Sequence, residues 1–266
     1  MAGDYQTLAL EREGPILWLT LNRPAALNSL NLRMIDELHD FLDGLGDDRE
    51  TRVVVMRGAG RHFCAGLDLK ENRKEQTNTI PKYLRFQRSI SWLIVKMRRL
   101  PQPFVACVQG AASGGGFALV LAADVRIAGE SARMNAAFIR IGLSACDIGC
   151  SYMLPRLVGL SLASELLLTG KFIDAKRALS SGLVSQVVPD DQLQDAGRQM
   201  AQEIVANAPL AVVLTKEALN YNVDAGSLEA AIAMEDRQQI LTASTADCAE
   251  AVRGFFEKRT PQFQNR

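Results

Sequence analysis

Three segments of the sequence carry residue types that could bind an anion or move a proton. They are Arg61–Lys70 (RHFCAGLDLK), Gly110–Gly116 (GAASGGG) and Ile141–Gly149 (IGLSACDIG). The second ends in three consecutive glycines before an apolar stretch, and the third places a single carboxylate, Asp147, among uncharged residues. Backbone N–H groups at a helix start can hold an oxyanion, and a carboxylate in apolar surroundings can act as an acid or a base.

The glycine run Gly114–Gly116 precedes Phe117, where an apolar helix is predicted to start. The first N–H groups of that helix would point outward with the positive end of the helix dipole behind them, which suits an oxyanion. The same residues also fit a tight turn with close packing, and both interpretations stay open here. The run is neither a GxGxxG dinucleotide motif nor a GKS/T phosphate loop, and Ser113 lies in no GxSxG motif.

Asp147 is the foremost candidate acid or base because Ile141–Met153 contains no other charged residue. Partial burial there would raise its pKa, as expected for a general acid or base. The alternative is that Asp147 caps a helix beginning near Ile148. Two further candidates have structural explanations, namely Asp68 as a helix cap after a turn and His62 as a loop histidine with its hydrogen bonds satisfied.

The composition limits the possible functions. Of the 266 residues, 48% are hydrophobic, which is enough for a full core, and 30 basic residues balance 30 acidic ones. No overall charge favours nucleic acid or an anionic membrane surface as a partner. The first residues lack the pattern of a leader peptide, and no stretch approaches the roughly 18 apolar residues of a membrane span. We therefore expect a cytoplasmic protein.

The five cysteines are an odd number, and none of them form a CxxC motif. We therefore expect reduced thiols rather than disulfides. Cys146 and Cys150 could lie one helical turn apart, but no second pair of cysteine or histidine residues accompanies them. We therefore expect no metal site.

The elements that must position these segments alternate between strand and helix. Ile16–Leu21, Val53–Met56 and Phe104–Val108 are predicted to be buried strands. Helical spacing of apolar residues predicts one helix through Met34–Leu42 and another through Ile90–Met97. Strands separated by helices indicate an α/β fold with parallel pairing. The candidate segments then lie on loops beside strands and helices, where ligands collect in such folds.

The C-terminal part of the sequence has a different pattern. Beyond Pro189, helices are predicted with no strand between them, at Leu193–Ala206, Leu210–Asn220, Leu228–Leu241 and Ala249–Phe255. We therefore divide the chain into a core, residues 1–189, and a C-terminal helical region, residues 190–266. No long linker separates the two, so we expect the helical region to pack on the core or on a neighbouring subunit.

Together, these segments resemble the crotonase superfamily, or enoyl-CoA hydratase/isomerase family, over essentially the whole chain. The matching text is LNRPAALNSL (21–30), GRHFCAGLDLK (60–70), QGAASGGGFALVLAADVRIAG (109–129), LPRLVG (154–159), LLLTGKFIDAKRALSSGLVSQVVP (166–189) and FFEKRTPQF (255–263). The resemblance implies a crotonase (ClpP-like) spiral of ββα turns with a C-terminal helical trimerisation region. It also implies a homotrimer or a dimer of trimers.

The resemblance further implies an acyl-CoA substrate and a set of residues that bind it. In this family the thioester carbonyl sits between two backbone N–H groups, which match Leu67 and Gly115 here. Such an oxyanion hole stabilises an enolate, and loss of one donor typically costs about 10²- to 10³-fold in rate. The positions that match CoA-contacting residues of the family are Ala26, Leu27, Ala65, Asp68, Leu69, Lys70, Phe255 and Lys258, the last two sometimes supplied by a neighbouring subunit.

Two positions depart from the hydratases of the family. Those enzymes hold a water molecule between two glutamates, whose matching positions here are Ala118 and Phe138. A methyl group and a phenyl ring offer no hydrogen-bond donor or acceptor, so the usual hydration geometry would be missing. The departures argue against ordinary water addition.

Asp147 instead matches the single acid of family members that move double bonds, although its segment is one residue longer than in several relatives. One carboxylate suffices for a 1,3-proton shift through an enolate. We therefore expect an enoyl-CoA isomerase that needs no bound cofactor beyond the coenzyme A of its substrate. The alternatives are a hydratase with a non-standard site and a non-catalytic acyl-CoA-binding protein. The acyl group would be set by the variable segment Glu71–Arg88, which one sequence does not define.

Overall fold

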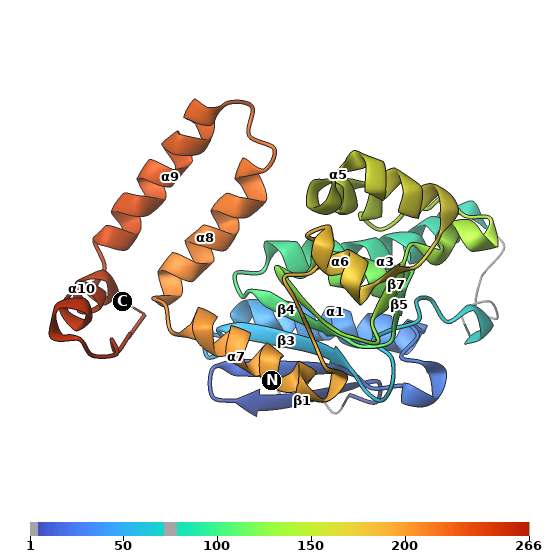
Figure 1. The fold of residues 1–266 in the computed structure, drawn as a ribbon, viewed down its shortest axis with the longest axis horizontal. Coiled ribbons are helices and arrows are strands. Elements are labelled where there is room, and N and C mark those ends of the chain that lie inside the picture. The colour runs from blue at the N-terminus through green and yellow to red at the C-terminus, as the bar shows by residue number, and fades with distance from the viewer. Residues whose placement is uncertain (1–4, 72–78, 266) are drawn as a thin grey trace.

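The computed structural model describes residues 5–71 and 79–265 of the chain. It has a layered core with three helices projecting to one side (Figure 1). The main sheet runs in the order β1 (Leu8–Glu13), β2 (Ile16–Leu21), β3 (Val53–Gly58), β4 (Phe104–Val108), β6 (Val125–Gly129) and β9 (Gln186–Val188). Each pair from β2 to β9 is parallel, and β1 is antiparallel to β2. The predicted parallel α/β core is confirmed.

A second, smaller sheet joins β5 (Ala111–Ser113), β7 (Arg133–Asn135) and β8 (Ile173–Asp174). An isolated parallel bridge between Cys64 and Ala112 extends this sheet toward the loop after β3. The chain therefore passes repeatedly from a strand of the large sheet to a strand of the small one and then into a helix. This ββα repeat brings the loops at the small sheet together although they are far apart in sequence.

The helices that accompany the strands include α1 (Leu32–Asp47), α3 (Ile80–Arg99), α4 (Gly115–Ala122), α5 (Cys150–Thr169) and α6 (Ala175–Ser180), with short 3-10 helices at Pro24–Ala26, Ala137–Ile141 and Asp190–Gln192. In α1, Met34, Leu38, Phe41 and Leu45 are buried at helical spacing, which gives the helix one apolar face. Asn31 begins this helix, because its side chain accepts a hydrogen bond from the Met34 N–H. The predicted amphipathic helix therefore covers the sheet.

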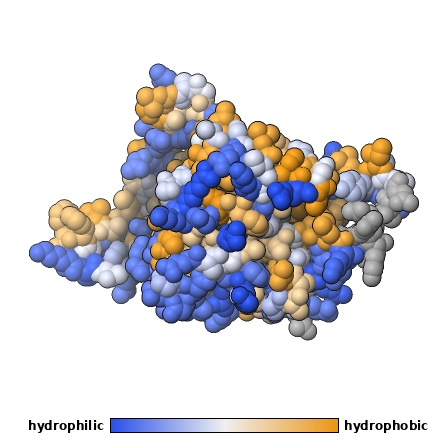
Figure 2. Space-filling model, turned by 45° about the vertical axis from the view of Figure 1, so that its right-hand side comes forward, coloured by the Kyte–Doolittle hydropathy of each residue, from blue (hydrophilic) through white to orange (hydrophobic). Residues whose placement is uncertain are grey.

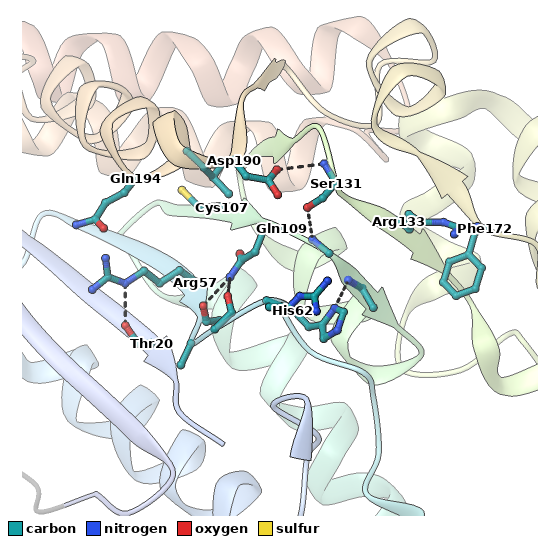
Figure 3. Close-up of a pocket in the computed structure, with 17 residues that line it drawn as sticks. Thr20, Arg57, His62, Cys107, Gln109, Ser131, Arg133, Phe172, Asp190 and Gln194 are labelled. Carbon is teal, nitrogen blue, oxygen red and sulfur yellow. Dashed lines mark hydrogen bonds between the residues drawn. The ribbon is translucent and has the colours of Figure 1, made fainter. Parts of the chain in front are cut away.

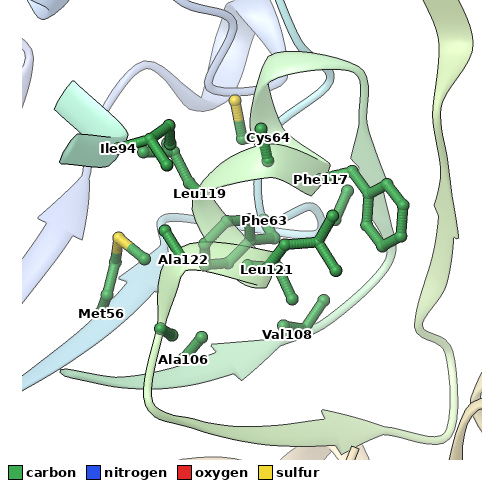
Figure 4. Close-up of a cluster of buried hydrophobic side chains, with 14 of the residues drawn as sticks. Met56, Phe63, Cys64, Ile94, Ala106, Val108, Phe117, Leu119, Leu121 and Ala122 are labelled. Carbon is green, nitrogen blue, oxygen red and sulfur yellow. The ribbon is translucent and has the colours of Figure 1, made fainter. Parts of the chain in front are cut away.

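The main hydrophobic core lies between the large sheet and α1, α3, α4 and α5. Helix α4 is buried along its whole length. Figure 4 shows its Phe117, Leu119 and Leu121 packed among side chains from β3, from the loop after β3 and from β4. A helix that is apolar all round must be enclosed by protein. The start of α4, at the glycine run, is consequently fixed from several sides.

Helix α7 (Leu193–Val205) packs against the other face of the large sheet. Its Leu193 and Ala201 share a second apolar cluster with Trp18, Val55 and Cys107. The predicted division at residues 189 and 190 therefore separates α7 from the sheet that it covers. The helices that extend away from the core begin only with α8.

The projecting helices are α8 (Pro209–Asn222), α9 (Leu228–Ala243) and α10 (Ala246–Glu257) (Figure 1). Lys216 fastens α8 to the core, since its buried ammonium group donates to the carbonyls of Gln102 and Met97 and pairs with Asp124 at 2.9 Å. Desolvation by burial lowers the pKa of Lys216, and Asp124 opposes that effect.

Large apolar side chains remain exposed on the projecting helices, namely Leu228, Ile240, Leu241, Val252, Phe255 and Phe256. Figure 2 shows such hydrophobic surface gathered at the tips of this part of the molecule. Within residues 5–71 and 79–265, the structure contains no helix that is both long and apolar enough to span a membrane.

Candidate active site

The loops after β3 and before α1 are joined edge to edge. Leu30 and Leu67 form a parallel bridge, in which the Leu30 N–H donates to the Gly66 carbonyl at 2.7 Å. The Asp68 N–H donates to the Leu30 carbonyl at 2.9 Å. This pairing uses the Gly66 carbonyl and the Asp68 N–H. The N–H of Leu67, which lies between them, takes no part in the hydrogen bonds between the two segments.

The same loop approaches the start of α4 closely. A Cβ atom on Gly66, whose φ is +97°, would lie 2.8 Å from the Ser113 carbonyl oxygen and 3.5 Å from the Gly115 nitrogen. A Cβ atom on Gly115 would lie 2.9 Å from the Leu30 side chain. Glycine is required at position 66, where a Cβ atom would meet backbone, and the close approach brings Leu67 and Gly115 to neighbouring positions.

The N–H groups of Leu67 and Gly115 have no hydrogen-bond acceptor among the residues that the structure describes. Gly115 is the first residue of α4, so its N–H lies at the positive end of the helix. Two adjacent N–H groups without protein partners are chemically suited to receive a carbonyl oxygen that gains negative charge. The assignment of Leu67 and Gly115 to an oxyanion hole remains a prediction.

Asp147 has one oxygen engaged and one free. Its Oδ1 accepts hydrogen bonds from the Gln87 side-chain amide at 2.6 Å and from the Ile148 N–H at 2.8 Å. No group of the described chain bonds to Oδ2. Burial raises the pKa of Asp147, and the two hydrogen bonds from Ile148 and Gln87 oppose that rise. The carboxyl group therefore has one oxygen without a partner in the described chain and a raised pKa, and both features suit proton transfer.

The alternative role of Asp147 as a helix cap does not hold in the structure. Helix α5 begins at Cys150 with Gly149 as its N-cap residue, and no side chain caps it. Ile148 has a positive φ of 37°, which is an unfavourable conformation for a β-branched residue. Strain of this kind persists where surrounding packing enforces it. Here Ile148 is buried, and its side chain lies 3.8 Å from a Cβ atom built on Gly115.

The positions of the two hydratase glutamates are apolar in this protein. Ala118 lies in α4 and is fully buried, and Phe138 is 9% exposed. The Phe138 ring lies 3.5 Å from a Cβ atom built on Gly114. Neither side chain has an atom that could orient water.

Six of the predicted CoA-contacting residues, Ala26, Leu27, Ala65, Asp68, Leu69 and Lys70, gather on one surface. The Ala65 N–H donates to the Leu27 carbonyl at 3.0 Å, which joins the two loops. Asp68 pairs with Arg23 at 3.1 Å and accepts N–H bonds from Lys70 and Glu71. Asp68 therefore has the capping role expected from its sequence, and its part in CoA binding remains a prediction.

The remaining two CoA candidates, Phe255 and Lys258, are not brought to this surface. Phe255 is on α10 and is 79% exposed, and Lys258 ends the same helix in a left-handed conformation. In Figure 1, α10 lies at the opposite end of the molecule from β5 and α5. Within one chain these two residues are therefore remote from Asp147.

Sequence reasoning missed Gln87, which lies in α3 and bonds directly to Asp147. The available signal was its spacing, because Gln87 precedes the buried residues Ile90 and Ile94 by three and seven positions and so shares their helix face. A polar residue on a buried face needs a hydrogen-bond partner.

A separate cavity of about 890 Å³ lies at the carboxyl ends of β2, β3 and β4, on the side covered by α7 (Figure 3). Arg57, His62, Gln109, Arg133 and Asp190 are among its lining residues. Nδ1 of His62 accepts a hydrogen bond from the Ala111 N–H, consistent with its expected structural role. None of the predicted catalytic or CoA-contacting residues lines this cavity.

Comparison with known proteins gives one family. The family model for enoyl-CoA hydratase/isomerase matches residues 11–266. A Mycobacterium tuberculosis protein named probable enoyl-CoA hydratase EchA12 is 41% identical, over 99% of this chain and 95% of that protein. The 1,2-epoxyphenylacetyl-CoA isomerase of Escherichia coli is 35% identical, over 94% of this chain and 95% of that protein.

The solved structure of an enoyl-CoA hydratase from Bacillus anthracis superposes with a TM-score of 0.93 at 35% identity, and the match covers 98% of this chain and 100% of that one. The layered ββα architecture is thus the crotonase fold that the sequence predicted. The matching family model, the sequence identities and the superposition agree that the chain belongs to the enoyl-CoA hydratase/isomerase family.

Proposed function

We propose that the protein moves a double bond within an enoyl-CoA thioester, with Asp147 as both base and acid. The observation that carries the proposal is the Asp147 carboxyl group, which has a free Oδ2, a pKa raised by burial, and two N–H donors on Oδ1. The side chain of its neighbour Ile148 lies 3.8 Å from a Cβ atom built on Gly115, which supports a position of Asp147 near the proposed oxyanion hole.

The reaction is a 1,3-proton shift in a 3-enoyl thioester. The Asp147 carboxylate takes a proton from C2, and the electron pair moves into a dienolate whose oxygen is stabilised by the N–H groups of Leu67 and Gly115. The protonated Asp147 then returns a proton to C4, and the double bond moves to C2–C3. The substrate and product have the same composition, and the thioester itself supplies the activation, so the mechanism calls for no bound cofactor.

The apolar residues Ala118 and Phe138 support isomerisation over hydration. Water addition needs a group that positions the water and removes its proton, and neither side chain can do so. An apolar wall also protects the dienolate from protonation by solvent. Asp147 would then be the sole proton carrier for the acyl chain.

We further propose that the loops carrying Ala26, Leu27, Ala65, Asp68, Leu69 and Lys70 hold the CoA portion. Phe255 and Lys258 can take part only from a neighbouring chain, because α10 lies at the far end of its own molecule (Figure 1). The exposed apolar side chains of α9 and α10 support burial between subunits, in the trimer or dimer of trimers expected for the helical region. We also propose a cytoplasmic location for the enzyme.

Hydration is the second candidate, and it is favoured by the names of relatives. The E. coli 2,3-dehydroadipyl-CoA hydratase is 36% identical, and hydratase names outnumber isomerase names among the relatives compared. Asp147 would then have to activate water without a second carboxylate.

Proton NMR of the purified protein separates the two candidates. The substrates are trans-3-hexenoyl-CoA and, separately, crotonyl-CoA, each with wild-type protein and with Asp147→Asn. Migration of the double bond of the first substrate, lost in the variant, is the expected result. Formation of 3-hydroxybutyryl-CoA from crotonyl-CoA would replace the proposal with hydration, and inactivity toward both would point to a binding role or a different acyl group.

A further inference from the structure

Gln87 is the polar side chain that reaches Asp147 from a different element of the fold. It comes from α3, and its amide nitrogen lies 2.6 Å from Oδ1 of Asp147. The orientation of this amide follows from chemistry, because an ionised carboxylate only accepts hydrogen bonds and the NH₂ end of the amide must therefore face it. The contact is short, as expected when the acceptor is charged.

The Ile148 N–H is the second donor, and it bonds to the same oxygen, Oδ1, at 2.8 Å. An oxygen that already accepts two hydrogen bonds is stabilised in its unprotonated form. The proton of the acid state is therefore directed to the other oxygen, Oδ2. We propose that Gln87 is a positioning residue that fixes the Asp147 carboxyl group so that Oδ2 alone carries the transferred proton.

This inference rests on the proposed role of Asp147 as acid and base, and it adds a residue that sets when Asp147 is charged. Burial raises the pKa of Asp147, and the hydrogen bonds from Ile148 and Gln87 oppose that rise. Without the hydrogen bond from Gln87, only the Ile148 N–H counteracts the effect of burial. The pKa of Asp147 must therefore rise further. The base is then lost at a higher pH.

Other titratable groups near the carboxyl group do not interfere with the expected rise in the pKa of Asp147. The thiols on the same turn and on α5 are Cys146 and Cys150, and burial raises the pKa of Cys150 to about 12. The group that α3 presents to Asp147 is the uncharged amide of Gln87. Within the described part of the chain, no charged side chain shifts the pKa of Asp147.

The first variant for the test is Gln87→Met, which keeps the length of the side chain and removes the donor. The matched control is Gln199→Met, the same change at an exposed glutamine of α7, away from the proposed site. The intact protein is labelled with ¹³C at the aspartate carboxyl groups, and the Asp147 signal is identified by its absence in Asp147→Asn. Its pKa is read from an NMR titration, and the pH dependence of kcat/KM is measured beside it.

We expect the pKa of Asp147 to rise by about one unit in Gln87→Met and to stay unchanged in Gln199→Met, because a hydrogen bond to a charged group is worth about that much. The acidic limb of kcat/KM moves by the same amount, so the variant loses about tenfold at low pH and much less at high pH. A merely structural defect would lower kcat/KM at every pH without shifting the acidic limb of the pH profile.

An Asp147 signal that titrates alike in wild type and Gln87→Met overturns the inference. If the wild type shows no turnover of any enoyl-CoA, the proposed reaction fails, but the titration still decides the role of Gln87. If Gln87→Met does not fold, Gln87→Glu fills the same space and places a second carboxylate beside Asp147. That variant must raise the pKa of Asp147 through like-charge repulsion, and an unchanged value there also overturns the inference.

Discussion

Two aspartates on neighbouring loops of this protein have opposite surroundings. Burial acts to raise the pKa of Asp68, but the Glu71 N–H, Arg23 and the Lys70 N–H outweigh it and leave the pKa lowered. Burial also raises the pKa of Asp147, whose partners in the described part of the chain are two N–H donors and no cation, and there the rise prevails. The comparison shows that the partner set, more than burial, decides the direction of the shift.

The difference fits the separate tasks proposed for the two carboxylates. Asp68 is held as an anion by Arg23 and by the helix start that it caps, so it orders the loop. Asp147 has no partner for its Oδ2 among the described residues and is easier to protonate, which suits the proposed proton transfer in both directions. Each prediction below changes one side of this comparison.

The largest effect is expected from Asp147→Asn. The amide can still accept the two hydrogen bonds on its oxygen, but it cannot take a proton, so isomerisation should fall by about 10³-fold. The rate of double-bond migration in 3-hexenoyl-CoA measures this, with Asp68→Asn as the matched control. Equal losses in the two variants would remove the distinction between the carboxylates.

Gly116→Ala tests the contact that holds both loops in place. Its new Cβ atom would lie 2.2 Å from the Cys64 carbonyl oxygen, so the loop leading to Asp68 must move away from α4. We expect a loss of about 2–3 kcal/mol in the free energy of unfolding, measured by urea denaturation. Gly226→Ala is the control, because no atom lies within 4 Å of the added Cβ there. If Gly116→Ala and Gly226→Ala had equal free energies of unfolding, the loop at Cys64 would be able to move away from α4 without loss of stability.

Asp68→Asn is expected to change binding rather than chemistry. Loss of the partly buried pair with Arg23 loosens the loop proposed to hold CoA, and about 1 kcal/mol corresponds to a rise of about fivefold in KM with little change in kcat. Steady-state kinetics give both constants. Glu50→Gln removes a carboxylate whose side chain is 82% exposed and should alter neither. A fall in kcat for Asp68→Asn would assign that carboxylate to the chemistry.

The smallest effect expected is on stability, where substitution of the two aspartates should change the free energy of unfolding in opposite directions. The raised pKa of Asp147 means that its favourable contribution exists at acid pH and is lost as pH rises through the folded-state pKa. The lowered pKa of Asp68 gives a contribution present above the unfolded-state pKa and lost as pH falls. At pH 7, Asp147→Asn should therefore raise Tm and Asp68→Asn should lower it. Calorimetry at pH 7 and pH 4 checks both signs, and shifts in the same direction would contradict the comparison.

Three central strands and the C-terminal helices followed from the sequence because apolar periodicity is a local property. Val53–Met56 and Phe104–Val108 lie in β3 and β4, and the four predicted C-terminal helices are α7 to α10. Periodicity could not tell which helix covers the sheet. Leu193 and Ala201 of α7 complete a core with Trp18, a contact between residues far apart in the chain, so the division at 189 separated elements that pack together.

The sequence by itself determined the family, the α/β class and the identity of Asp147 as the lone carboxylate of its segment, because these depend on residue order and residue type. Only the tertiary structure decided the surroundings of that carboxylate. The positive φ of Ile148 moves the start of α5 beyond it, and Gln87 reaches it from a helix 60 positions away in sequence. The pKa of a carboxyl group depends on burial and on neighbours in space, and neither can be read along the chain.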